Sequence, residues 1–116
     1  MPNIIGDIRY IASRLSQEDI LCQLAEEAAE LSQAALKLRR AITGTNPTPI
    51  PEEAAIDNLF TELTDVMLAR EAYFESYTKD KRHLTPPDDY VRAIADVKLR
   101  RWVERLKEKE NSNDEG

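Results

Sequence analysis

The chain has 116 residues, about the size of one domain, of which 41% are hydrophobic and 33% are charged. Its 22 acidic and 16 basic side chains give a net charge of −6, which argues against polymeric nucleic acid and anionic membranes as partners. The single cysteine excludes an internal disulfide and a cysteine-rich metal site. The sequence has no secretory signal pattern and no run of about 18 apolar residues, so we expect a cytoplasmic protein.

Hydrophobic residues recur every three or four positions from the N-terminus onward, which is typical of helices. A first helix is expected over residues 4–15, and Ser16 predicts the N-cap of a second, long helix. This helix is expected to end near Thr43 and Gly44, where the segment TGTNPTPIP interrupts the pattern. Its apolar stripe is expected to contain Leu21, Leu24, Ala28, Leu31, Ala35 and Leu38.

Pro51 is expected to open a third helix, and a fourth helix is expected from Thr85 or Pro86 to about Glu108. The apolar stripe of the third helix is expected to contain Ile56, Leu59, Phe60, Leu63, Met67, Phe74 and Tyr77. We predict an all-α fold: an antiparallel bundle of about four helices in a single domain over residues 1–109, followed by a disordered polar tail over 110–116. Because helices of these lengths form a thin core, we expect a second chain to complete the bundle.

Two acidic clusters lie on the two long helices. The segment EEAAE supplies Glu26, Glu27 and Glu30, and the segment ELTD supplies Glu62 and Asp65. Side chains three residues apart project from one side of a helix, and at 100° per residue both pairs are expected to flank the apolar stripe. An antiparallel hairpin would then bring four carboxylates together at the edge of the interface between the two helices.

Four neighbouring carboxylates repel one another, and a hard divalent cation such as Mg²⁺ or Mn²⁺, which prefers oxygen ligands, would relieve that repulsion. A cation held in this way suits hydrolysis of a phosphoanhydride in a nucleotide. Asn58 lies one turn before Glu62 and is a candidate for a hydrogen bond to a substrate or to a carboxylate. The alternative interpretation is a solvated acidic surface, because helices of acidic proteins commonly carry glutamate pairs.

With QLAEEAAEL on one helix and FTELTDVML on the next, the chain resembles the MazG-type nucleoside triphosphate pyrophosphohydrolases over about residues 11–105. The resemblance implies a hydrolase that cleaves the bond between the α- and β-phosphates, releases a nucleoside monophosphate and pyrophosphate, uses Mg²⁺ or Mn²⁺, and forms homodimers or homotetramers. It matches Glu27, Glu30, Glu62 and Asp65 to the metal-binding acids. It further implies that Glu26 orients the attacking water and that Glu26 and Glu30 are the catalytic acids.

The basic segment DVKLRRW near the C-terminus is similar to a Lys-x-x-Arg segment of that family. This similarity implies that Lys98 and Arg101 contact the phosphates. The alternative is that these cations form a solvated helix face that pairs with Glu104. A second hypothesis for the whole chain is a non-catalytic helical dimerisation or interaction module, in which the acidic clusters contribute only solubility.

Overall fold

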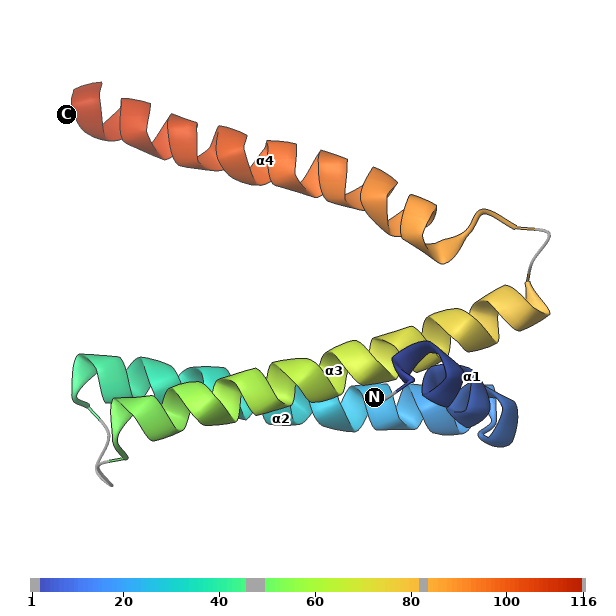
Figure 1. Ribbon diagram of the computed structural model, residues 1–116. Helices are drawn as coiled ribbons and strands as arrows, with labels where there is room; N and C mark the ends of the chain where they lie inside the picture. Colours follow the sequence, from blue (N-terminus) through green and yellow to red (C-terminus); the bar gives the residue numbers. More distant parts are fainter. Residues whose placement is uncertain (1–2, 46–49, 82–83, 116) are drawn as a thin grey trace. The chain divides into compact units, whose positions relative to one another are not determined.

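The protein is built from four α-helices, which the computed structural model describes over residues 3–45, 50–81 and 84–115. They are α1 (Ile4–Arg14), α2 (Gln17–Thr43), α3 (Glu52–Asp80) and α4 (Pro87–Glu115) (Figure 1). The described ranges contain no strand, so the predicted all-α fold is confirmed. Within those ranges, no helix combines the length and the apolar character needed to cross a membrane. Part of the proline-rich connection, residues 46–49, lies outside the described residues.

Contacts divide the chain into two compact units, unit 1 (Met1–Lys79) and unit 2 (Asp80–Gly116). Unit 1 contains α1, α2 and nearly all of α3, and unit 2 contains α4; the single domain expected over residues 1–109 stays a prediction. The helix α4 also continues to Glu115, past the expected end near Glu108, so residues 110–115 of the expected polar tail are helical. Extending an existing helix by further residues costs little, because only the first turn carries the nucleation penalty. Gly116 lies outside the described residues.

The ends of α1 and α2 follow local capping chemistry. The Asn3 side chain accepts a hydrogen bond from the Gly6 amide at 3.0 Å, and the Ser16 hydroxyl accepts one from the Asp19 amide at 3.1 Å. Gly44 closes α2 in the left-handed conformation, with φ of 70°, which glycine adopts without a steric penalty. The predicted N-cap and end of α2 are confirmed.

The helices α2 and α3 lie side by side as an antiparallel hairpin (Figure 1), and their contact faces repeat with alternating steps of four and three residues. This repeat is the spacing of knobs-into-holes packing. On α2 the buried and half-buried line is Ile20, Leu24, Glu27, Leu31, Ala34, Leu38 and Ala41. On α3 the corresponding line is Ala55, Leu59, Glu62, Val66, Ala69, Tyr73 and Ser76. Each helix therefore carries one glutamate within its contact line.

On α2, every second position of the buried line lies one residue before the corresponding position of the stripe that the sequence predicts. Leu21, Ala28 and Ala35 are exposed, and the contact line runs through Ile20 and Ala34 instead. On α3, three residues of the expected stripe are also exposed in this chain: Phe60, Leu63 and Met67. The physical reason is that each long helix has two adjacent apolar rows, and only the packing partner decides which row is buried.

The short helix α1 packs against both helices of the hairpin as the third helix of unit 1. Ala12 is buried and Ile8 is half-buried, although most of α1 is exposed. Arg9 Nε lies 3.5 Å from Glu75 Oε1, an ion pair that connects α1 with α3. This arrangement places α1 beside the first half of α2 and the second half of α3, toward the end of the hairpin away from the α2–α3 connection (Figure 1).

Candidate metal centre

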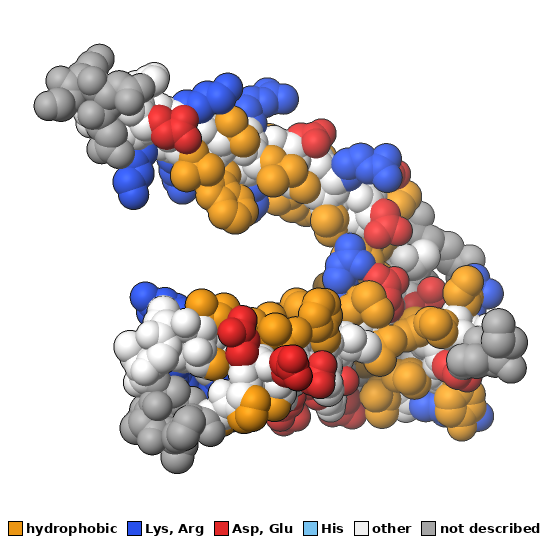
Figure 2. Space-filling view, turned by 60° about the vertical axis from the view of Figure 1, so that its left-hand side comes forward, with side chains coloured by type: hydrophobic (Ala, Val, Ile, Leu, Met, Phe, Trp, Pro, Cys, Tyr) orange, Lys and Arg blue, Asp and Glu red, His pale blue; other side chains and the backbone are white. Residues whose placement is uncertain are grey.

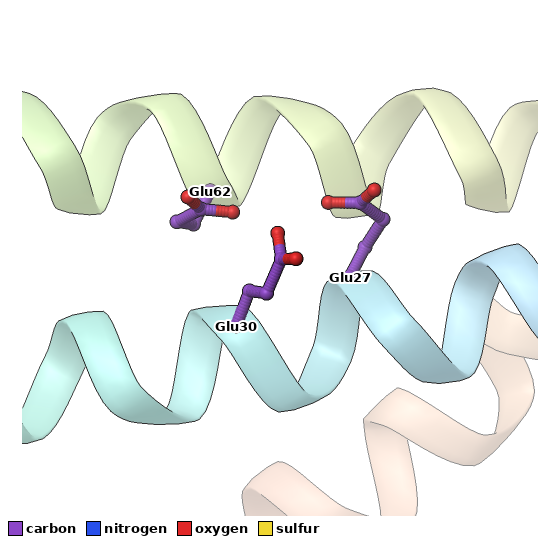
Figure 3. A group of neighbouring side chains, drawn as sticks. All are labelled: Glu27, Glu30 and Glu62. Carbon is purple, nitrogen blue, oxygen red and sulfur yellow. The ribbon is translucent and has the colours of Figure 1, made fainter.

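Three glutamates meet between α2 and α3. Glu27 and Glu30 come from α2 and Glu62 comes from α3, and each contributes a carboxylate oxygen to a group in which all three oxygens lie within 4.8 Å of one another. Figure 3 shows the three carboxylates in the space between the two helices. Figure 2 shows acidic side chains gathered on one face of unit 1 with hydrophobic side chains on either side. The hairpin geometry thus joins two sequence segments that are about 35 residues apart.

The burial of this group distinguishes it from an ordinary acidic surface. Glu27 and Glu62 are half-buried, and the Oε2 atom of each is shielded from solvent without a hydrogen-bond partner among the described residues. Glu30 is exposed. Buried polar atoms in native proteins are nearly always paired, so an unpaired carboxylate oxygen on each of these two residues requires an explanation.

The surroundings of Glu27 change the pKa of its carboxyl. Burial raises the pKa of the Glu27 carboxyl above its ordinary value, and the negative charges of Glu30 and Asp65 raise the pKa further. A hydrogen bond from Gln23 Nε2 to Glu27 Oε1, 2.6 Å long, opposes that shift because it stabilises the ionised form. The site therefore favours a positive charge, supplied either by a proton or by a cation.

The other acids of the two motifs are placed less centrally. Asp65 is half-buried on α3 and close enough to influence the charge of Glu27, but it is outside the group of three converging oxygens. Glu26 is exposed on α2, and Asn58 is exposed on α3. The structure thus brings together three of the four predicted metal ligands directly and the fourth at their side.

The two predicted phosphate contacts, Lys98 and Arg101, belong to unit 2. Both are exposed on α4 and line a shallow groove on that helix with Tyr90, Ile94 and Val97. They are therefore neighbours on one helix face, as a spacing of three residues requires.

Sequence reasoning missed two features of unit 1. Gln23 lies four residues before Glu27 on α2, and this spacing alone could have identified it as a partner of that carboxylate. The second feature is a cavity of about 380 Å³ between α1, α2 and α3, which Glu27 and Asp65 help to line. No local pattern indicates this cavity, because its walls come from three separate segments.

Comparisons of the chain with models of known protein families, with curated proteins and with solved structures find no significant match. The function must therefore be inferred from the side chains of the site.

Proposed function

We propose that this protein is a metal-dependent hydrolase that cleaves the α–β phosphoanhydride of nucleoside triphosphates and releases a monophosphate and pyrophosphate. The observation that carries the proposal is the pair of buried, unpartnered carboxylate oxygens of Glu27 and Glu62. Both residues occupy positions of the helix contact lines where an apolar side chain would be more stable. Sequences break such local packing rules mainly at functional sites.

The side chains present fit a hard divalent cation. The donors are all carboxylate oxygens, which Mg²⁺ and Mn²⁺ prefer, and they come from rigid helices. Glu27, Glu30 and Glu62 would hold the cation, with Asp65 as a further acid at the side of the group. When bound, such a cation supplies a Lewis acid that withdraws charge from phosphate oxygens.

The choice of a nucleotide as substrate relies on the resemblance of the two acidic motifs to the MazG-type pyrophosphohydrolases. In that scheme Glu26, which is exposed on the helix that carries Glu27 and Glu30, orients the attacking water, a role that the resemblance implies. Lys98 and Arg101 are the predicted phosphate contacts and Asn58 is a predicted polar contact of the substrate. We propose a cytoplasmic location, since nucleoside triphosphates are abundant there.

The test is a panel of ribo- and deoxynucleoside triphosphates incubated with Mg²⁺ or Mn²⁺, with separation of the products. Glu30→Gln removes one ligand charge from an exposed position, so it is expected to lower turnover by about 100-fold or more while the fold persists. Glu18→Gln is the matched control, because Glu18 is an exposed acid in the first turn of the same helix and does not belong to the group. It is expected to retain full activity.

Three results would overturn the proposal. Release of orthophosphate and a diphosphate would mean that another bond is cleaved. Equal activity of Glu30→Gln and the wild-type protein would mean that the acidic group takes no part in the reaction. Absence of turnover with every nucleotide and metal would favour the second hypothesis, a non-catalytic interaction module.

The exposed hydrophobic side chains are the observation that favours such a module, and they also suit an enzyme that works as an oligomer. On α4 the large exposed residues include Trp102, Leu99, Val97 and Leu106, with exposed fractions of 64%, 57%, 53% and 51%. Figure 2 shows hydrophobic side chains along α4 with Lys and Arg side chains beside them. We propose a homodimer or homotetramer that covers part of this surface, and sedimentation at several concentrations would measure the mass of the particle.

A further inference from the structure

The cavity between α1, α2 and α3 begins at the acids and continues among aliphatic side chains. Glu27 and Asp65 line it together with Ile8 and Ile11 of α1 and Leu68 of α3. Its volume of about 380 Å³ lies in the range of small-molecule sites. A ligand held at the carboxylates could therefore extend one end into an apolar pocket of the same unit.

The chemistry of the walls decides which end of a nucleotide enters. Phosphates and their cation need charged or polar partners, and they would lose hydration without compensation against the isoleucine side chains. The base is the part of the nucleotide with broad apolar faces, and such faces can lie against aliphatic walls while the phosphates remain at the carboxylates.

The polar groups of the cavity then select the edge of the base. Asp7 lines the cavity from α1, and its carboxylate makes no hydrogen bond or ion pair within the described residues. Gln23 also lines the cavity and donates through Nε2 to Glu27, so its amide oxygen is left as an acceptor. The Asp7 carboxylate is therefore available to a ligand only as an acceptor, whereas Gln23 keeps its amide oxygen as an acceptor and the second hydrogen of Nε2 as a donor.

We propose that this cavity receives the base of the nucleotide and that Asp7 selects bases with an exocyclic amino group, namely cytosine, adenine and guanine, over uracil and thymine. This inference rests on the proposed function. An amino group donates to the Asp7 carboxylate, whereas uracil and thymine place two carbonyl oxygens around their single N–H on the same edge, and the carboxylate repels these oxygens. Asp7 is thus a specificity-determining residue, distinct from the acids that hold the cation.

A purely helical role for Asp7 makes a different prediction. Asp7 lies in the first turn of α1, where an acid stabilises the helix dipole, and Asp19 occupies the equivalent turn of α2 without lining the cavity. Asp7→Asn and Asp19→Asn are therefore matched variants. Both remove a first-turn charge, but only Asp7→Asn changes the lining of the cavity.

The experiment compares kcat/KM for CTP and UTP in the wild-type protein and the two variants. The wild-type protein is expected to favour CTP at least tenfold. Asp7→Asn is expected to lower this ratio at least tenfold, because the asparagine amide can donate to uracil as well as accept from cytosine, and Asp19→Asn is expected to leave the ratio unchanged. An equal ratio in all three proteins, or a preference for UTP in the wild type, would overturn the proposal.

If no nucleotide is hydrolysed, the proposed function fails, and the cavity is judged by binding alone. Cytidine monophosphate added to the metal-free protein should shift the NMR methyl signals of Ile8 and Ile11 and leave Ile42, which is outside the cavity, unchanged. These shifts should be weaker with uridine monophosphate and in Asp7→Asn. Unchanged Ile8 and Ile11 signals, or equal shifts with both nucleotides, would overturn the selection by Asp7.

Discussion

Replacement of Glu62 by leucine tests whether the glutamates of the helix interface serve a ligand at the expense of stability. Glu62 lies between Leu59 and Val66 in the contact line of α3, and its Oε2 atom is buried without a partner. An unsatisfied buried polar group costs about 1–3 kcal/mol, and leucine has a similar size without that cost. Glu62→Leu is therefore expected to raise the free energy of unfolding of the metal-free protein by about 1–3 kcal/mol, or Tm by about 4–8 °C for each kcal/mol.

The assay is thermal unfolding followed by circular dichroism, first with EDTA and then with increasing Mg²⁺. A cation that binds only the folded wild-type protein stabilises it by about 2.7 kcal/mol at 100 times its dissociation constant. The leucine variant has lost a ligand, so Mg²⁺ is expected to change its Tm much less. Glu18→Leu, at an exposed position outside the group, is the control, with an expected change within about 0.5 kcal/mol in either solution.

Two outcomes would refute this reasoning. A lower Tm of Glu62→Leu in EDTA would mean that the carboxylate makes stabilising interactions in the metal-free protein. An equal rise in Tm with Mg²⁺ for the wild-type protein and Glu62→Leu would mean that Glu62 does not bind the cation.

Two further predictions concern Glu27 and Gly44. Burial raises the pKa of the Glu27 carboxyl, so the folded protein binds a proton at this carboxyl more tightly than the unfolded chain does. The free energy of unfolding of the metal-free protein should therefore fall as pH rises from the ordinary pKa of glutamate through the raised pKa. Glu27→Gln should remove this decrease in denaturation series at several pH values, and parallel curves for the two proteins would contradict the assignment. Gly44→Ala should destabilise the protein by about 1 kcal/mol in urea, because φ is 70° and an added Cβ meets nothing within 4 Å, so only backbone strain contributes. Gly44→Asn should cost less, since asparagine tolerates this conformation, and equal costs for both variants would argue against a backbone origin.

The sequence alone determined the local elements of this protein. Ser16 and Gly44 mark the ends of α2 because capping depends on side-chain and backbone chemistry within a few residues. The spacing of Glu27 to Glu30 and of Glu62 to Asp65 likewise placed each acidic pair on one side of its helix. The extension of α4 to Glu115 was missed, because its polar residues carry no apolar period that would mark them as helical.

Only the tertiary structure decided where the acids lie. The apolar residues of α2 form two adjacent rows, and the sequence analysis predicted burial of the row through Leu21 and Ala28, not of the row through Ile20 and Ala34. Packing against α3 buries the second row, and this rotation moves Glu27 from the flank of the stripe into the contact line. The cavity beside it depends on α1 as well, so it exists only when three segments meet. Helix periodicity is a local property, whereas the burial of a carboxylate depends on which surface of another helix faces it.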